Sequence, residues 1–399
     1  MSDIKIVMIG LGYIGLPTAA LIASKNINVY GVDVNQHVVD TINKGEIHIV
    51  EPKLDILVKD VVEKGFLKAS LEPIEADIYL IAVPTPFKGD YEPDIAYVEA
   101  AIRKLIPTLK EGALVIIEST SPVGTTEKMQ KIIFAERPEL KGKIYMAFCP
   151  ERVLPGNVIY ELENNDRAIG GINPESTEQA IDFYKQFVTG ELHKTNARTA
   201  ELTKLVENAS RDVQIAFANE LSMICDKAGI NVWELINLAN KHPRVNILQP
   251  GTGVGGHCIA VDPWFIVSAF PKEAKIIRAA REINNYKTEW VIEKIKNKAL
   301  HFKINHNREP IIACLGLAFK PNIDDLRTSP ALHVAQTLNK DHKIVVVEPN
   351  IETHNDFELY SLDDALNKAD IVVVLVGHNE FENIAIKDKV VLDFVNSIN

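Results

Sequence analysis

The sequence predicts an α/β protein with two doubly wound domains, which are joined by a long central helix and a helical middle region. In the first region, apolar strands at 76–83, 113–117 and 144–148 alternate with helical patterns. This alternation is typical of a parallel sheet covered by helices on both faces. From about Arg198 the pattern changes to sustained helical periodicity. From about Pro310 the chain repeats the outline of the first region.

A glycine-rich turn follows the first apolar strand. Residues 4–9 form that strand, Gly10-Leu11-Gly12-Tyr13-Ile14-Gly15 comes directly after it, and residues 16–24 have a helical pattern. Strand, G-x-G-x-x-G and helix together are the context in which a Rossmann-like domain binds a dinucleotide, with the pyrophosphate at the helix N-terminus. Asp33 ends the next strand, where a carboxylate accepts hydrogen bonds from the ribose hydroxyls. No arginine lies in residues 34–40 to attract a 2′-phosphate, so we expect NAD rather than NADP.

Composition and charge narrow the class of protein. The 399 residues are 46% hydrophobic and 24% charged, which is ordinary for a globular enzyme of two or three domains. A net charge of −11 argues against nucleic acid as a partner. The four cysteines are scattered without metal-ligand spacing, so no metal site is expected. Without a signal sequence or an apolar run of about 18 residues, we expect a cytoplasmic protein with no membrane partner.

Polar side chains follow three strands of the first region. Thr85, Thr120 and Glu151 each come just after an apolar strand. Ligands of parallel α/β sheets bind at the C-terminal ends of the strands. These three residues are therefore candidates for a functional site.

The central helical stretch carries a polar triplet. Lys204, Asn208 and Arg211 are spaced i, i+4 and i+7, so they share one face of a helix. A lysine can stabilise negative charge on a reacting oxygen, and an arginine can bind a phosphate or carboxylate. The alternative is a solvated stripe without function. A helix from 198 to 228 would exceed roughly 40 Å, a length that commonly links domains or supplies a dimer interface.

One cysteine lies behind a flexible, glycine-rich loop at 251–256. Cys258 is followed four residues later by Asp262, so a reachable thiol would have a carboxylate beside it to handle protons. The alternative is a buried core cysteine, which is the commoner fate of this residue. A thiolate that attacks an aldehyde forms a thiohemiacetal, which can lose a second hydride to become a hydrolysable thioester. With NAD, Cys258 therefore predicts a four-electron oxidation of a primary alcohol to an acid. Upstream, His242 is a candidate for a sugar hydroxyl and Arg244 for an anion.

The last region is expected to be a second Rossmann-like domain. Its strands at 311–316, 343–348 and 369–374 echo those of the first region, and the second of them again ends in an acid. Only Gly316 remains of the glycine fingerprint, so a mononucleotide or sugar nucleotide is a better ligand than a dinucleotide. The alternative is that βαβ units merely look alike. Lys320 and Arg327 lie in the loop that leaves the first of these strands, at the ligand edge. Further helices are expected at 232–239 and 274–300, and the expected domains are 1–197, 198–305 and 306–399.

The chain resembles the UDP-glucose/GDP-mannose dehydrogenase family over nearly its whole length. The motifs that match are G-L-G-Y-I-G-L-P, V-P-T-P, E-S-T-S-P-V-G, C-P-E-R, G-G-H-C-x-x-x-D-P and F-K-P-N-x-D-D-x-R. The resemblance implies two Rossmann-like domains joined by a long helix at a homodimer interface. It also implies oxidation of a UDP-sugar at C6 to the uronic acid with two NAD⁺. The forms H-P-R-V-N-I-L-Q-P-G and C-I-A-V-D-P-W-F look most like those of the family members that oxidise UDP-N-acetyl-D-mannosamine. This resemblance implies that sugar nucleotide as the substrate, for bacterial surface-polysaccharide synthesis.

The resemblance further implies roles for single residues. Cys258 would be the covalent nucleophile, and Lys204 would act as general acid/base or oxyanion stabiliser with the help of Asn208. Water and protons would be handled by Asp262, Thr120 and Glu151. NAD would be bound by Gly10, Gly12, Tyr13, Ile14, Gly15, Asp33, Thr85, Thr126 and Arg327. The sugar nucleotide would be surrounded by Arg152, Val153, Lys204, Asn208, Arg211, His242, Arg244, Gly255, Phe319 and Lys320, with Arg244 reaching into the site of the neighbouring subunit.

Three alternatives remain open at this point. The nearest differs only in the sugar and takes UDP-N-acetylglucosamine or UDP-glucose. A single-step NAD-dependent hydroxyacid dehydrogenase has a similar architecture but needs no cysteine. A nucleotide-sensing protein would bind both ligands without forming NADH.

Overall fold

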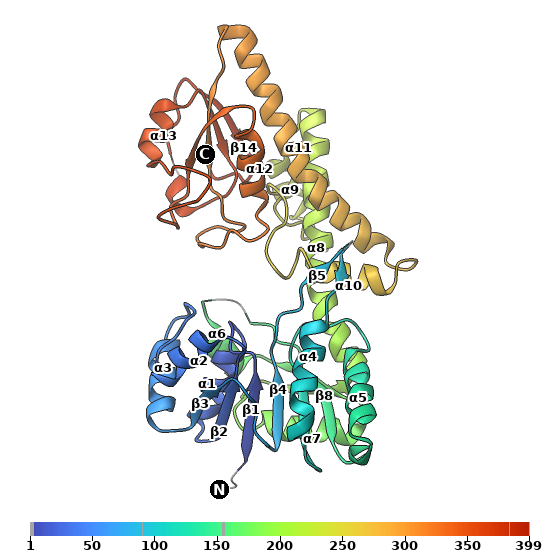
Figure 1. Ribbon diagram of the computed structural model, residues 1–399. Coiled ribbons are helices and arrows are strands. Elements are labelled where there is room, and N and C mark those ends of the chain that lie inside the picture. The colour runs from blue at the N-terminus through green and yellow to red at the C-terminus, as the bar shows by residue number, and fades with distance from the viewer. Residues whose placement is uncertain (1–3, 90, 154–155, 383, 399) are drawn as a thin grey trace. The chain divides into compact units, whose positions relative to one another are not determined.

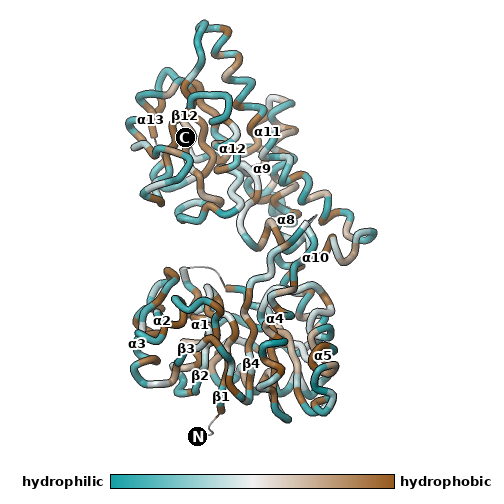
Figure 2. Tube along the Cα trace, in the orientation of Figure 1, coloured by the Kyte–Doolittle hydropathy of each residue, from teal (hydrophilic) through white to brown (hydrophobic). Residues whose placement is uncertain are grey.

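The structure is a computed structural model that describes residues 4–89, 91–153, 156–382 and 384–398. The chain forms two compact units, Met1–Val206 and Glu207–Asn399. Each unit has a sheet and apolar clusters of its own, and Figure 2 shows hydrophobic segments inside both units. The two expected Rossmann-like domains are confirmed, one in each unit.

An eight-stranded sheet forms the centre of the first unit, in the order β10-β9-β8-β7-β4-β1-β2-β3 (Figure 1). All neighbouring strands run parallel except β8 and β9, which are antiparallel. The strands that the sequence indicated in this region all run parallel, as expected. The antiparallel pairing was not foreseen because the sequence analysis did not identify β9 as a strand. The strands are β1 (Lys5–Ile9), β2 (Asn28–Val32), β3 (Leu67–Ser70), β4 (Ile78–Ile81), β7 (Leu114–Ile117), β8 (Tyr145–Phe148), β9 (Arg167–Gly171) and β10 (Leu192–Asn196), with a small hairpin of β5 (Phe87–Lys88) and β6 (Glu92–Pro93).

Helices cover both faces of this sheet. Along β1, Ile6 packs in one apolar cluster and Val7 in the other, because successive side chains of a strand point to opposite faces. One cluster holds residues of α1 (Gly15–Ser24), α2 (Gln36–Asn43), α3 (Leu54–Glu63), α6 (Val158–Asn164) and α7 (Pro174–Tyr184), and the other holds residues of α4 (Ala96–Leu105) and α5 (Thr125–Glu136). This is the doubly wound arrangement that the sequence predicts.

The long helix is present as α8 (Ala197–Ala228), which has 32 residues. The boundary between the two units falls inside it, after Val206. Among the described residues, no helix has the length and apolar character needed to cross a membrane.

A four-stranded parallel sheet in the order β12-β11-β13-β14 forms the centre of the second unit. Residues of α11 and α12 pack on one face and those of α13 on the other, and Figure 1 shows α12 and α13 on opposite sides. The sequence did not predict α10, which follows the cysteine loop. The elements are β11 (Ile311–Leu315), β12 (Lys343–Val347), β13 (Ile371–Val374), β14 (Val390–Asp393), α9 (Val232–Ala239), α10 (Asp262–Ala269), α11 (Lys275–His306), α12 (Pro330–Leu338) and α13 (Leu362–Lys368), and short 3₁₀ helices lie at Ile106–Thr108, Pro138–Leu140 and Asn379–Phe381. The separate middle domain at 198–305 stays a prediction.

Candidate active site

The glycine turn between β1 and α1 leaves part of its backbone open. Gly10 has a φ of +89°, and a Cβ there would lie 2.5 Å from the carbonyl oxygen of Ala82. A Cβ on Gly15 would lie 1.8 Å from the carbonyl oxygen of Gly10, whereas a Cβ on Gly12 would meet nothing within 4 Å. The first and third glycines are therefore needed by the fold, and Gly12 faces open space. An open backbone at a helix N-terminus suits a pyrophosphate.

Asp33 lies at the tip of β2 beside this turn. Its Oδ2 accepts a hydrogen bond from the backbone N of Leu11 at 3.0 Å, and its Oδ1 accepts one from Asn35 N at 2.9 Å. A carboxylate offers about four acceptor positions, so sites remain for ribose hydroxyls. Tyr13, in the turn itself, is 53% exposed. Turn, helix terminus and acid together fit NAD.

Three candidate residues lie at one edge of the first sheet. Thr85, Thr120 and Glu151 follow β4, β7 and β8, which are adjacent parallel strands. Thr85 and Thr120 are both half-buried. The sheet therefore brings to its ligand-binding edge the residues that the sequence indicated.

The carboxylate of Glu151 holds the backbone that follows it. Its Oε1 accepts hydrogen bonds from the backbone N of Arg152 at 2.6 Å and of Val153 at 3.1 Å. Its Oε2 accepts one from the guanidinium of Arg167 at 3.1 Å. Glu151 thus fixes the two residues expected to contact the sugar nucleotide, and its part in proton transfer stays a prediction.

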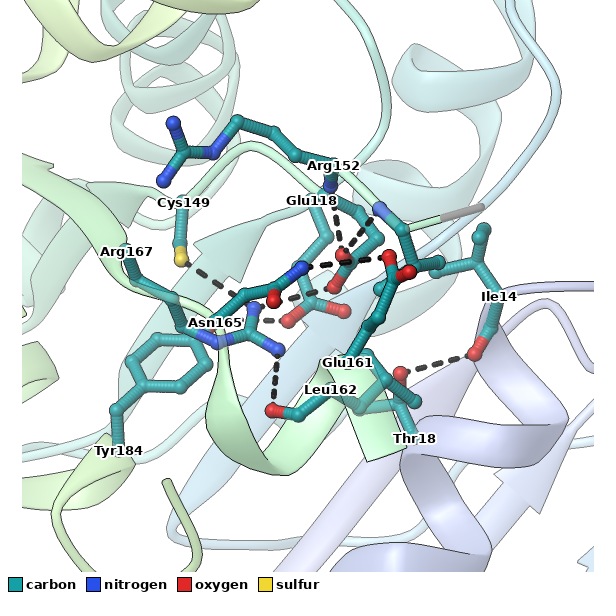
Figure 3. A network of polar contacts seen from close by, with 12 residues as sticks. Ile14, Thr18, Glu118, Cys149, Arg152, Glu161, Leu162, Asn165, Arg167 and Tyr184 are labelled. Carbon is teal, nitrogen blue, oxygen red and sulfur yellow. Dashed lines mark hydrogen bonds and ion pairs between the residues drawn. The ribbon is translucent and has the colours of Figure 1, made fainter. Parts of the chain in front are cut away.

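A buried polar network lies around Arg167 (Figure 3). The guanidinium lies over the ring of Tyr184, 5.1 Å from its centroid, and Tyr184 donates a hydrogen bond from its hydroxyl to Glu118 Oε1 at 2.6 Å. Burial raises the pKa of Glu118 to about 7, although the charge of Arg167 opposes this rise. Burial also raises the pKa of the Cys149 thiol to about 11. Cys149 is therefore a core thiol without nucleophilic character at neutral pH, as its apolar setting predicts.

Thr126, an expected NAD contact, is fully buried at the start of α5. Its backbone N and its hydroxyl both donate to Glu201 Oε1, at 2.8 and 2.7 Å. Glu201 Oε2 accepts a further hydrogen bond from Gly124 N at 2.6 Å. The carboxylate, which belongs to α8, thereby caps α5, and the contact between Thr126 and NAD stays a prediction.

The second unit brings three expected catalytic residues together. Asp262 is the first residue of α10, and its backbone N donates to the carbonyl oxygen of Cys258 at 2.8 Å. Asn208, on α8, donates from Nδ2 to Asp262 Oδ2 at 2.6 Å. Asp262 is only 3% exposed, whereas Cys258 is exposed. Lys204 lies one turn earlier on α8, within the first unit.

Gly255 and Gly256, just before Cys258, are closely packed, whereas Gly251 at the start of the loop is open. The flexibility of the loop stays a prediction. A Cβ on Gly255 would lie 2.7 Å from the carbonyl oxygen of Thr328 and 2.8 Å from the Cβ of Phe319. Gly256 has a φ of +84°, and a Cβ there would lie 2.9 Å from the ring of Phe319. The absence of side chains at Gly255 and Gly256 thus allows the cysteine loop to approach the segment that contains Phe319. Gly255 and Phe319, both expected to contact the sugar nucleotide, therefore lie side by side.

Other expected ligand contacts lie on the surface of the second unit. Arg327 is exposed and forms a two-point ion pair with Asp325, with Nε–Oδ1 and Nη2–Oδ2 distances of 2.8 and 2.6 Å. The Nδ1 atom of His242 accepts a hydrogen bond from Arg244 N at 3.3 Å. Arg211, His242, Arg244 and Lys320 are all exposed. Their roles in binding stay predictions.

Sequence reasoning missed the buried polar residues that support these sites. Glu118 directly follows the apolar strand β7, and a charged residue at the end of such a run was the available signal. Arg167 begins β9, which the sequence did not predict as a strand. Asn219, buried on α8, accepts a hydrogen bond from Gly251 N at 2.9 Å and so holds the start of the cysteine loop. A single polar residue on a helix belongs to no spacing motif, so Asn219 had no comparable signal.

Comparison with known proteins agrees with this arrangement. Residues 4–188 match the NAD binding domain of the UDP-glucose/GDP-mannose dehydrogenase family, residues 198–286 its central domain, and residues 313–399 its UDP binding domain. NAD is therefore the cofactor of this chain.

Individual relatives are similar over nearly their whole length. A UDP-N-acetyl-D-mannosamine dehydrogenase of Campylobacter jejuni is 58% identical, with 97% of this chain and 98% of the relative covered. An NDP-N-acetyl-D-galactosaminuronic acid dehydrogenase of Ralstonia nicotianae is 54% identical, with 97% and 94% covered. The solved UDP-D-ManNAc dehydrogenase of Pyrococcus horikoshii is 39% identical, with 99% and 96% covered and a TM-score of 0.88. The chain belongs to the UDP-glucose/GDP-mannose dehydrogenase family.

Proposed function

We propose that this protein oxidises the C6 hydroxymethyl group of UDP-N-acetyl-D-mannosamine to the carboxylate with two NAD⁺, for surface-polysaccharide synthesis. The observation that carries the proposal is the exposed Cys258 joined through Asp262 to Asn208. A dehydrogenase that stopped at the aldehyde would not need this thiol. The 58% identical relative supports the choice of sugar.

Each step of the reaction would be carried out by particular residues of the chain. Two NAD⁺ molecules, bound one after the other, would each accept one hydride. Lys204 accepts the proton of the C6 hydroxyl as the alcohol becomes an aldehyde. The thiolate of Cys258 adds to the aldehyde carbon, and Lys204 with Asn208 stabilises the resulting oxyanion. Loss of the second hydride leaves a thioester.

Water then hydrolyses the thioester and releases the uronic acid and the thiol. Asp262 and Thr120 would guide this water and its protons. In its present contacts Glu151 holds the backbone of Arg152 and Val153, and through these residues it would act on the bound sugar nucleotide.

The substrate proposal is tested by counting NADH against sugar consumed. UDP-N-acetylmannosamine, UDP-N-acetylglucosamine, UDP-N-acetylgalactosamine and UDP-glucose are compared side by side with the purified full-length protein. We expect two NADH per UDP-N-acetylmannosamine and much slower turnover of the others. The 54% identical relative makes the galactosamine sugar the second candidate, and preferential turnover of that sugar or of UDP-glucose would overturn the substrate assignment.

The need for a thiol is tested with Cys258→Ser. We expect acid formation to fall by about a thousandfold or more, because a serine hydroxyl is a far weaker nucleophile at neutral pH. Cys225→Ser, at a buried cysteine of α8, is the matched control. Undiminished acid formation in the Cys258 variant would support a dehydrogenase that does not use covalent catalysis.

We further propose that the protein acts as a cytoplasmic homodimer in which Arg244 reaches the site of the neighbouring copy. The large apolar side chains of Phe217, Ile224 and Tyr286, on α8 and α11, are more than half exposed. Exposed apolar residues grouped on neighbouring helices are typical of an interface. Sedimentation of the wild type and of Phe217→Glu tests the dimer, and we expect the variant to be monomeric.

A further inference from the structure

The two Rossmann-like sheets carry an acid at the same topological position and use it differently. Asp33 directly follows β2 in the first unit, is half-buried, and accepts one hydrogen bond from the glycine turn. Glu348 directly follows β12 in the second unit and is only 4% exposed. Its Oε2 accepts hydrogen bonds from the backbone N of Leu317 at 2.7 Å and of Ala318 at 3.0 Å. The acid of the second unit is thus turned inward onto the loop that follows β11.

His378 joins this acid to the far end of the same loop. The imidazole is fully buried, with Nε2 3.1 Å from Glu348 Oε2 and Nδ1 2.9 Å from the backbone N of Asn322. A backbone N–H can only donate, so Nδ1 is the acceptor and the ring proton lies on Nε2, which donates to Glu348. Burial alone would raise the pKa of Glu348, but the hydrogen bonds from His378 and Leu317 bring it to about 2.

The loop held in this way, residues 317–322, has a conformation that needs support. Asn322 has a φ of +60°, a left-handed conformation that costs free energy outside glycine. Its side-chain amide exchanges two hydrogen bonds with Asn379, with Nδ2–Oδ1 and Oδ1–N distances of 2.9 Å each. Between the fixed ends lie Phe319, which packs against Gly255 and Gly256, and the exposed Lys320.

We propose that Glu348 and His378 are positioning residues, which hold residues 317–322 in the shape that binds the UDP portion of the sugar nucleotide. Oε2 of Glu348 is occupied by Leu317, Ala318 and His378, and Oε1 accepts from the backbone N and Nδ2 of Asn350 at 3.0 and 3.2 Å. With both oxygens occupied, Glu348 does not bind a ribose as Asp33 is expected to do. The strand-end acid instead acts through the loop. This proposal rests on the proposed function, because it assumes that a UDP-sugar is the ligand of this unit.

Two isosteric variants separate the contacts of His378. The amide oxygen of Asn in His378→Asn replaces the Nδ1 acceptor for Asn322, whereas Gln in His378→Gln reaches the Nε2 position and keeps only the contact with Glu348. The exposed His301 of α11 provides the control variant His301→Gln. UDP and NAD are titrated separately into each full-length protein by calorimetry.

We expect His378→Gln to weaken UDP binding by about tenfold or more, because the variant loses the Nδ1 atom, which lies 2.9 Å from both Asn322 N and Asn350 Nδ2. His378→Asn should remain within about threefold of the wild type, and affinity for NAD should not change in any variant. The KM for the UDP-sugar should rise in His378→Gln while kcat changes little. Wild-type affinity for UDP in a folded His378→Gln, or an equal loss of NAD binding, would overturn the proposal.

The same titrations distinguish the two proposals. If the wild type binds UDP and His378→Gln does not, but UDP-N-acetylmannosamine yields no NADH, then the substrate assignment fails and the positioning role holds. If the wild type fails to bind UDP, the positioning role itself is wrong.

Discussion

At the residue scale, two buried carboxyl groups share one cation. Arg167 forms its ion pair with Glu151, and Glu118 receives only the hydroxyl of Tyr184. Two carboxylates beside a single guanidinium would leave a net buried negative charge, which low dielectric disfavours. Glu118 therefore keeps its proton near neutral pH, and Arg167 remains available to orient Glu151.

The raised pKa of Glu118 predicts how the stability of the protein depends on pH. Because the pKa of Glu118 rises from 4.5 to about 7 on folding, the unfolded state holds fewer protons between these values, and the wild type loses stability as pH rises from 4.5 to 7. Glu118→Gln removes this loss, so the variant should gain on the wild type across that window. Thermal unfolding between pH 4.5 and 8 measures the effect.

The exposed Glu63, at the end of α3, gives the control variant Glu63→Gln. Its unfolding profile should follow the wild type at every pH. Parallel profiles for the wild type and Glu118→Gln would mean that Glu118 is ionised in the folded protein.

The sequence identified the residues that carry chemistry better than those that support them. Cys258 and Asp262 stand out because four residues separate a thiol from a carboxylate behind a glycine run. Glu118 and Arg167 become meaningful only when β7 and β9 are placed in one sheet with β8 between them. Contacts between distant segments of the chain leave no spacing for a pattern to detect.

At the scale of elements, the turn from β1 to α1 contains glycines of two kinds. Two of them are needed for folding, and one is open to the expected ligand. Gly10 and Gly15 are enclosed by backbone atoms, and Gly12 is open. The G-x-G-x-x-G pattern predicts the turn but does not assign these different reasons to its members. The structure distinguishes the three glycines by the atoms that a Cβ would meet at each position.

Two alanine variants test this assignment. Gly12→Ala should fold with the stability of the wild type and bind NAD about tenfold or more weakly, because its methyl group lies where the pyrophosphate approaches. Gly15→Ala should lose about 3 kcal/mol or more, because its methyl group would overlap the carbonyl of Gly10. Thermal unfolding and NAD titration measure both. Unchanged NAD affinity in Gly12→Ala would place the pyrophosphate elsewhere.

The pair α8 and α11 encloses an unusual lysine. Lys287 is 2% exposed, donates to the hydroxyl of Ser222 at 2.7 Å and lies 4.0 Å from the ring centroid of Trp290. Burial lowers its pKa from 10.5 to about 7. The unfolded state therefore binds more protons between pH 7 and 10.5, and stability should rise with pH in that range.

Replacing this lysine should stabilise the protein. Lys287→Met removes a buried cation whose hydration is lost on folding, and we expect a gain of about 1–3 kcal/mol at pH 7. The gain should shrink as pH rises toward 10.5. Chemical denaturation at pH 7 and 9.5 measures it, with the exposed Lys298→Met as control. Lower stability of Lys287→Met at both pH values would show that the contacts with Ser222 and Trp290 outweigh the burial of charge.

At the scale of the whole molecule, repetition of one fold accounts for much of what the sequence predicts. The strand echoes at 311–316, 343–348 and 369–374 correspond to β11, β12 and β13 of a parallel sheet. The strand β9, with its reversed pairing, and the helix α10 were not foreseen. The sequence of β9, Arg-Ala-Ile-Gly-Gly, is short and only partly apolar, and α10 begins without a side-chain cap. Charge and composition predicted a globular enzyme, but they carry no information on the direction of β9 or the presence of α10.

The central claim is that Cys258 captures the sugar aldehyde and carries it as a thioester, and its most direct test is the mass of the Cys258 peptide. Full-length protein is mixed anaerobically with NAD⁺ and UDP-N-acetylmannosamine, quenched in acid during turnover and digested. The account predicts an acyl adduct of the sugar nucleotide on Cys258, together with two NADH for each uronic acid released. Uronic acid formed at full rate with an unmodified Cys258 peptide at every quench time would contradict it.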